Sequence, residues 1–244
     1  MRAGHREPGG GRNGALRALV IQHEQPTPGG HVHRWLDERG AEQDTFRIDV
    51  ETRDPDARDY DLIVSLGSEF AAFDDSVPWL ARERKLLADA AQHEVAVLGI
   101  CFGGQLLARE LGGRSYRGET SEIGWLPVRS RDPSLVSDGP WFQWHFDTFT
   151  PPPGAELIAD SPAGPQAYVI GRSLGLQFHP EVTTEIMDAW VAVYRHELDQ
   201  EGVDPDRLLE RTYELADETR AAAWRLFDGF LERIAGLREV VRDR

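Results

Sequence analysis

The stretch that decides the fold is Val97-Leu-Gly-Ile-Cys-Phe-Gly-Gly-Gln105. It continues an almost wholly apolar run, Val95–Ile100, which is typical of a central parallel strand covered on both faces. The residues that follow, Gln105–Leu111, predict a helix that ends at Gly112-Gly113. Cys101 is therefore expected at a sharp turn between a buried strand and a helix.

The geometry of the turn explains why glycines flank Cys101. A strand-to-helix turn of this kind strains the backbone of the central residue, so Gly99 and Gly103 must lack a Cβ. At the helix N-terminus, the dipole and the free amides favour a thiolate. The N–H of Phe102 points to where an oxyanion would develop. An inert buried thiol is the alternative interpretation of this cysteine.

A second motif, Gly175-Leu-Gln-Phe-His-Pro-Glu181, is an apolar strand whose end presents His179 and Glu181. Pro180 fixes the turn between them, so both side chains can be directed to one side. A cysteine nucleophile needs a base, and the imidazole needs a carboxylate to fix its tautomer. Taken alone the motif fits a surface turn, but together with Cys101 it predicts a catalytic triad.

The remaining pattern alternates short β-branched runs with amphipathic stretches, which predicts an α/β fold with an open, mainly parallel sheet flanked by helices. Further strands are expected at 16–22, 45–50 and 62–66, and helices at 29–39 and 80–92. From Ser115 to Glu181, short runs split by Pro and Gly predict appended antiparallel hairpins, at 123–128, 141–149, 156–159, 167–170 and 175–178.

The last sixty residues are expected to be helical. Asp204 followed by Pro205 is a helix start. An apolar stripe at helical spacing comprises Leu209, Tyr213, Ala216, Ala223, Phe227, Phe230, Ile234 and Leu237. The stripe favours packing on the domain's own core, with a partner or homodimer surface as the alternative. We expect a leader at 1–14, one main domain at 15–182, and a helical extension at 183–244 packed on it.

Composition excludes several classes of function. The net charge of −15 disfavours nucleic acid and anionic membrane surfaces, and no apolar run is long enough to span a bilayer. Cys101 is the only cysteine, which fits a reducing cytoplasm and excludes an intrachain disulfide. His23-Glu24 and His31-x-His33 lack the spacing of metal ligands and are expected in a polar loop. The sequence predicts neither a metal nor a cofactor.

Together, Gly99-Ile-Cys-Phe-Gly-Gly-Gln105 and Gln177-Phe-His-Pro-Glu181 resemble the motifs of the class I, triad-type glutamine amidotransferases. The closest resemblance is to stand-alone proteins similar to the glutaminase domain of GMP synthase, and it extends from about Leu16 to Val182. Supporting matches are Leu66-Gly67, Phe73-Asp74, Pro78-Trp79-Leu80, Leu106–Ala108, Leu111–Gly113, Glu122–Trp125, Trp144-His145 and Asp147.

The resemblance implies a flavodoxin-like sheet with the active site at the carboxyl ends of its strands. It also implies that Cys101 attacks the glutamine amide and that ammonia leaves with a proton from His179. Gln105 matches a position that helps to hold glutamine. The segment His145, Phe146 and Asp147 matches the one that meets its α-amino and carboxylate groups.

One loop departs from the family pattern. The usual Gly-Gly-Pro, which supplies the second oxyanion amide, here reads Gly67-Ser68-Glu69. The loop loses a glycine and the stiffening proline, and a carboxylate at Glu69 would disfavour an oxyanion if it pointed inward. We therefore expect weak free glutaminase activity or a changed amide substrate.

Family members usually pass ammonia to a synthase module, and the chain shows no nucleotide-binding loop of its own. A separate synthase subunit is one expectation. The alternatives are a γ-glutamyl peptidase or hydrolase that transfers no ammonia, and a catalytically silent regulatory relative.

Overall fold

The computed structural model describes residues 15–237, so the leader expected at 1–14 lies outside the described residues. Its main sheet has the strand order β2-β1-β3-β4-β10-β9-β8-β6. The bounds are β1 Arg17–Gln22, β2 Glu42–Arg47, β3 Leu62–Ser65, β4 Ala96–Ile100, β6 Arg129–Ser130, β8 Glu156–Ser161, β9 Gly164–Ile170 and β10 Ser173–Leu176. Neighbours from β2 to β10 pair in parallel, and β9, β8 and β6 continue the sheet antiparallel.

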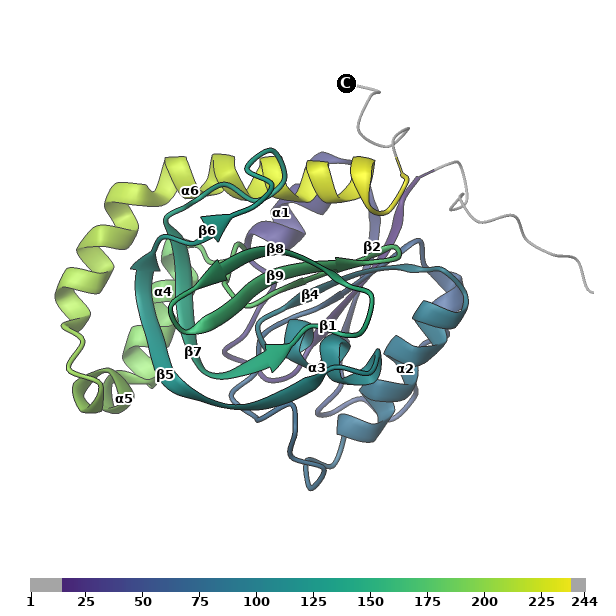
Figure 1. Ribbon diagram of the computed structural model, residues 1–244, viewed down its shortest axis with the longest axis horizontal. Coiled ribbons are helices and arrows are strands. Elements are labelled where there is room, and N and C mark those ends of the chain that lie inside the picture. Colours follow the sequence, from purple (N-terminus) through teal and green to yellow (C-terminus); the bar gives the residue numbers. More distant parts are fainter. Residues whose placement is uncertain (1–14, 238–244) are drawn as a thin grey trace, which may run out of the picture.

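Helices cover both faces of this sheet (Figure 1). They are α1 His31–Glu38, η1 Ala57–Asp59, α2 Leu80–Gln92, α3 Phe102–Glu110, α4 Thr184–Val193, α5 Arg195–Gln200 and α6 Pro205–Arg233. Side chains alternate along β1, so Ala18 and Val20 pack in the cluster that contains residues of α1 and α6. Leu19 and Ile21 pack in the cluster that contains residues of α2 and α3. The predicted α/β fold with a mainly parallel sheet is confirmed.

A second, two-stranded antiparallel sheet pairs β5 (Arg114–Leu126) with β7 (Trp141–Thr150). Only the end of β5 was expected from the sequence. Its first part is mostly exposed and polar, so it lacks the alternating apolar signal of a half-buried strand. Phe142 of β7 joins a third apolar cluster with α4, including Met187 and Trp190.

Two further expectations need correction. The strand expected at 45–50 runs from Glu42 to Arg47. Its start could not be predicted because its polar first half lies at the sheet edge and carries no hydrophobic signal. The run expected at 175–178 as part of an antiparallel hairpin is β10, which also pairs in parallel with β4. The two motifs singled out in the sequence thus follow adjacent parallel strands.

The long C-terminal helix α6 begins as expected. The Asp204 carboxylate accepts hydrogen bonds from two backbone N–H groups of the first turn, and Pro205 is the first residue. Phe227 and Phe230 are fully buried in the same cluster as the sheet. In the first half the buried positions fall one residue earlier than expected, and Tyr213 is 55% exposed. Buried threonines such as Thr212, which accepts from the Trp125 indole, hide this face from an apolar pattern.

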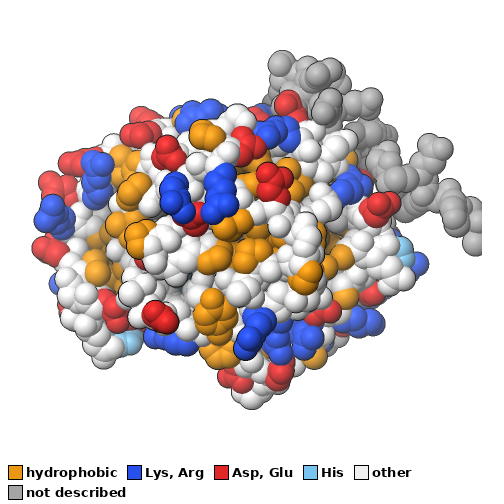
Figure 2. Space-filling model, viewed as in Figure 1, with side chains coloured by type: hydrophobic (Ala, Val, Ile, Leu, Met, Phe, Trp, Pro, Cys, Tyr) orange, Lys and Arg blue, Asp and Glu red, His pale blue; other side chains and the backbone are white. Residues whose placement is uncertain are grey.

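On the face drawn in Figure 2, acidic and basic side chains are interspersed around the rim, and hydrophobic atoms gather near the middle. The net negative charge therefore forms no single acidic patch on this face. Within residues 15–237, no helix combines the length and the apolar character that a membrane span needs.

Candidate active site

Cys101 lies between β4 and α3, with the backbone angles φ 50° and ψ −107°. Its N–H donates to the Leu176 carbonyl of β10, and its side chain is 6% exposed. A Cβ on Gly99 would lie 2.6 Å from the carbonyl oxygen of Gly103, and one on Gly103 would lie 2.2 Å from that of Ser65. Both flanking glycines are therefore required by close backbone packing, as the strained turn predicted.

His179 and Glu181 follow directly on β10, and both are buried. The Glu181 Oε1 atom lies 2.7 Å from His179 Nδ1. Burial lowers the pKa of His179, but the charges of Glu181 and Cys101 raise it by more, so the net pKa lies well above its ordinary value. The His179 ring packs edge-on against Trp190, with ring centres 5.2 Å apart. The raised pKa of His179 favours the imidazolium form.

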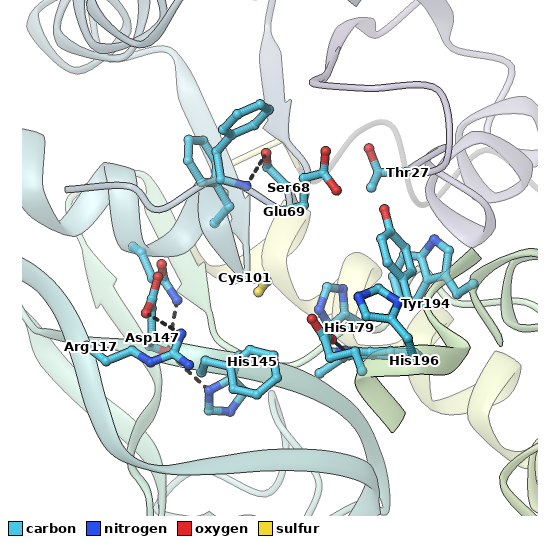
Figure 3. Close-up of a pocket in the computed structure, with 18 residues that line it drawn as sticks. Thr27, Ser68, Glu69, Cys101, Arg117, His145, Asp147, His179, Tyr194 and His196 are labelled. Carbon is cyan, nitrogen blue, oxygen red and sulfur yellow. Dashed lines mark hydrogen bonds and ion pairs between the residues drawn. The ribbon is translucent and has the colours of Figure 1, made fainter. Parts of the chain in front are cut away.

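Cys101 and His179 line the same cavity (Figure 3). A Cβ placed on Gly67 would lie 2.9 Å from His179 Cε1 and 3.9 Å from Cys101 Cβ, so Gly67 is next to both residues and leaves little room for a side chain. No residue described by the structure hydrogen-bonds to His179 Nε2 within the usual geometry. The structure thus brings Cys101, His179 and Glu181 together at the carboxyl ends of β4 and β10.

The loop Gly67-Ser68-Glu69 forms one wall and is held by Glu24. The Glu24 carboxylate accepts from Ser68 Oγ at 3.1 Å and from the Glu69 N–H at 2.7 Å. Burial raises the pKa of Glu24. Burial and the charges of nearby carboxylates, that of Glu69 among them, raise the pKa of Tyr194 to about 12. Glu69 and Tyr194 thus line the same cavity and interact through charge.

Gln105 projects from α3 beneath the cavity. Its Nε2 donates to the Asp147 carbonyl at 3.1 Å and to Gln177 Oε1 at 3.2 Å. Gln177 Nε2 in turn points to Cys101 Sγ at 3.6 Å. These amides connect the cysteine to β7, and both side chains are nearly inaccessible to solvent.

The segment 145–147 of β7 forms the floor opposite the loop. Both ring nitrogens of His145 are engaged, Nδ1 with the Asp147 carbonyl and Nε2 with Glu122, each at 3.1 Å. Arg117 stacks 4.6 Å from the centre of the Phe146 ring and lies 3.4 Å from the Asp147 carboxylate. Burial raises the pKa of Asp147, although Arg117 opposes this. His145 is thus held in place by the protein, and Phe146 and Asp147 line the open cavity.

The cavity has a volume of about 430 Å³, within the range of small-molecule sites. Sequence reasoning missed several residues that line it: Thr27, Phe70, Arg117, Trp190, Tyr194, His196 and Glu197. Four of these come from α4, α5 and their junction, beyond the motifs. No spacing signal distinguishes them from ordinary helix residues, so only the fold could reveal them.

The other histidines weighed in the sequence do not form the polar loop that was expected. His23 is fully buried beneath the 67–69 loop, and His31 and His33 belong to α1. Among residues 15–237, no group of three or more His, Cys, Asp or Glu side chains is arranged to hold a metal ion.

The chain is similar in sequence and in fold to proteins of known family. The sequence model described as "Glutamine amidotransferase class-I" matches residues 30–192, more than half of the chain. The chain belongs to the class I glutamine amidotransferase family. Its fold superimposes on that of a glutamine amidotransferase from Thermotoga maritima with a TM-score of 0.82 and 31% identity, covering 89% of this chain and 98% of that one. A glutamine amidotransferase from Methylobacillus flagellatus matches with a TM-score of 0.82 and 26% identity, covering 89% and 95%.

Curated relatives point to one branch of the family. The GMP synthase (glutamine-hydrolyzing) of Aeropyrum pernix is 35% identical over 129 residues, which is 47% of this chain and 25% of that protein. The GMP synthase of Thermus thermophilus is 42% identical over 94 residues, which is 35% of this chain and 19% of that protein. The match thus spans a quarter or less of the length of each of these relatives. The expected resemblance to the glutaminase domain of GMP synthase is confirmed.

Proposed function

We propose that the protein hydrolyses the side-chain amide of glutamine through a thioester on Cys101. The observation that carries the proposal is the 2.7 Å contact between His179 Nδ1 and Glu181, in a cavity that His179 shares with Cys101. Because Glu181 engages Nδ1, protons enter and leave the ring through Nε2. That arrangement suits a base that serves a thiol and then a leaving amine.

In the first half of the reaction, the Cys101 thiolate attacks the amide carbon of glutamine and its proton resides on His179. The resulting oxyanion is bound by two N–H groups, that of Phe102 at the start of α3 and that of Ser68 in the cavity loop. The C–N bond then breaks, His179 Nε2 gives its proton to the nitrogen, and ammonia leaves. A γ-glutamyl thioester remains on the sulfur.

In the second half, a water molecule attacks the thioester carbonyl while His179 takes a proton from it. The C–S bond breaks, and the reaction releases glutamate and restores the Cys101–His179 pair. The net change is glutamine plus water to glutamate plus ammonia. Gln105, Phe146 and Asp147 are proposed to position the amino acid end of the substrate, and His145 to hold that segment.

A glutamine-analogue diazo-ketone tests the proposal. Wild-type protein should be alkylated once, at Cys101, and should lose its release of glutamate from glutamine in parallel. Cys101→Ala should be neither labelled nor active, and thermal unfolding of both proteins serves as the control for folding. A wild-type protein that is neither labelled nor active would favour a silent regulatory relative instead.

The size of the cavity favours a second candidate, a γ-glutamyl hydrolase or peptidase that transfers no ammonia. A volume of about 430 Å³ with aromatic lining from Trp144, Phe146, Trp190 and Tyr194 leaves room beyond a free amino acid. Such an enzyme would cleave N-substituted γ-glutamyl amides faster than glutamine. Turnover of γ-glutamyl dipeptides beside glutamine separates the two candidates.

If glutamine is the substrate, we propose that a separate synthase subunit, working in the cytoplasm with this chain, accepts the ammonia. The relatives named GMP synthase support a partner of this kind, because the chain matches only their glutaminase part. Co-purification with a candidate synthase and a rise in glutaminase turnover on mixing would test this assignment.

A further inference from the structure

A buried polar cluster outside the triad lies directly under the 67–69 loop. His23 follows β1, and its Nε2 lies 2.8 Å from Glu83 Oε2 of α2, with both side chains fully inaccessible to solvent. Glu83 Oε1 accepts from Ser65 Oγ at 2.6 Å. The other ring nitrogen, His23 Nδ1, lies 3.0 Å from the carbonyl oxygen of Gly67.

The chemistry of these partners fixes where one proton sits. A carbonyl oxygen only accepts hydrogen bonds, so His23 Nδ1 must carry a hydrogen and donate it to Gly67. The other proton lies between Nε2 and Glu83. Burial lowers the pKa of His23, but the Glu83 carboxylate, the charge of Glu24 and the Gly67 carbonyl together raise it by more, so the net pKa is raised and the imidazolium is favoured.

The direction of the Gly67 carbonyl determines the direction of the next amide. Among the described residues the only cis peptide is Gly139-Pro140, so the Gly67–Ser68 peptide is trans. In a trans peptide the C=O and N–H bonds point in opposite directions. The Gly67 carbonyl points to His23, so the Ser68 N–H points away from His23. Gly67 and Ser68 line the cavity, whereas His23 does not. No described residue accepts a hydrogen bond from this N–H.

We propose that His23 is a positioning residue that holds the Gly67–Ser68 peptide in the orientation in which the Ser68 N–H serves as the second oxyanion donor. The inference rests on the proposed amide hydrolysis and assigns a role to a cluster that the triad does not use. Because the loop has neither a second glycine nor a proline after Gly67, its geometry must be set by contacts. Glu24 supplies them from one side and His23 from the other.

The His23 ring is itself held rigidly. It stacks on Trp79 with ring centres 5.0 Å apart and packs edge-on against Phe102 at 4.7 Å. Phe102 carries the first oxyanion N–H, so one imidazole contacts both parts of the oxyanion site. A fixed ring with a fixed proton prevents the peptide from flipping its carbonyl into the cavity.

Substitution of His23 by asparagine or by glutamine distinguishes the contributions of its two ring nitrogens. The side-chain N–H of asparagine reaches the position of Nδ1, so His23→Asn keeps a donor for Gly67. That of glutamine reaches the position of Nε2, so His23→Gln keeps the Glu83 contact and loses the Gly67 one. We expect His23→Gln to lower kcat for glutamine hydrolysis by about 10²-fold with KM little changed, and His23→Asn to stay within about tenfold of wild type.

Alkylation of Cys101 by iodoacetamide is the control, because this displacement forms no oxyanion. Its rate should be equal in wild type, His23→Asn and His23→Gln. Equal loss of kcat in both variants, or a kcat for His23→Gln within about threefold of wild type, would overturn the inference. So would a fall in alkylation rate that parallels kcat.

Nitrogen NMR of histidine in the wild-type protein tests the inference where a variant fails to fold. His23 should show a protonated, slowly exchanging Nδ1 at neutral pH, and an unprotonated Nδ1 would contradict it. This measurement needs no catalysis. An inactive wild-type protein with the expected Nδ1 proton would therefore count against the proposed function and leave the orientation of the peptide standing.

Discussion

Glu181 acts in the proposed reaction only through His179. Its contribution to catalysis can therefore be measured by a substitution that removes its charge and keeps its shape. In Glu181→Gln the amide no longer fixes the tautomer of the imidazole or stabilises its cation. We expect kcat for amide hydrolysis to fall by on the order of 10²–10⁴-fold, measured as glutamate release.

The matched control is Glu69→Gln, because the Glu69 carboxylate lines the same cavity but is not bonded to His179. This variant should retain kcat within about threefold. Comparable losses in both variants would mean that the negative charge of the cavity, and not the pairing with His179, carries the effect.

His31 gives a second prediction, about stability and pH. Its ring is 5% exposed beside Trp224, and burial together with Arg34 and Arg220 lowers its pKa to about 4. Between about pH 6.5 and about pH 4, His31 is protonated in the unfolded chain but not in the folded protein. The contribution of His31 to the free energy of unfolding is therefore complete above about pH 6.5. It is lost as the pH falls toward 4, and the loss amounts to at most about 3 kcal/mol.

Urea unfolding of wild type and His31→Asn between about pH 7 and about pH 5 measures this contribution. The stability of wild type relative to the variant should decline with falling pH. His33→Asn, on the same helix, retains His31 and should keep the wild-type slope. A constant difference between wild type and His31→Asn would contradict the prediction.

At the scale of elements, α3 packs unusually close to the sheet. A Cβ on Gly104 would lie 2.3 Å from the Leu176 carbonyl of β10, so Gly104→Ala must push the helix away from the strand. We expect a loss of about 1–3 kcal/mol or more in the free energy of unfolding, measured with urea. Activity should fall as well, because α3 and β10 lead to Cys101 and His179.

Gly229→Ala in α6 is the control for the change of residue type. Its Cβ would meet only the flexible end of Leu135 at 3.0 Å, and alanine favours a helix interior. Its stability should stay close to that of wild type. If Gly104→Ala were equally well tolerated, the close approach of α3 to β10 would not be a constraint.

Elements with a strong local signal could be predicted from the sequence. The helix at Leu80–Gln92 has the expected bounds, and the apolar run before Cys101 is β4. The edge strand β2 and the exposed half of β5 could not, because their residues are polar and their pairing depends on distant strands. The buried face of the first half of α6 could not be predicted either, because it includes threonines that an apolar pattern ignores.

For the molecule as a whole, α6 shares one core with the sheet. Phe227 packs against Trp35 with ring centres 5.2 Å apart, and both belong to the cluster that includes Leu98 of β4. Phe227→Ala should therefore cost about 3–5 kcal/mol of unfolding free energy. Far-ultraviolet circular dichroism and tryptophan fluorescence should follow one coincident urea transition. Separate transitions would make 183–244 an independent unit.

The assembly of the site shows where sequence reasoning ends. The cysteine, histidine and carboxylate could be found because each stands in a motif with its own mechanical constraint. The wall formed by Trp190, Tyr194 and His196 could not, since these residues come to the cavity only because α4 and α5 fold over β7. The contacts of His23 could not be predicted either, because its partners Glu83 and Gly67 are distant in sequence.

Cys101 is the only sulfhydryl in these 244 residues, and it lies at the base of the cavity. An oxidant that converts this sulfur to a sulfenic acid finds no second cysteine in the sequence with which to form a protective internal disulfide. Loss of turnover under peroxide should therefore match loss of titratable thiol one for one. Recovery would depend on an external reductant, and it would cease once the sulfur reached the sulfinic state.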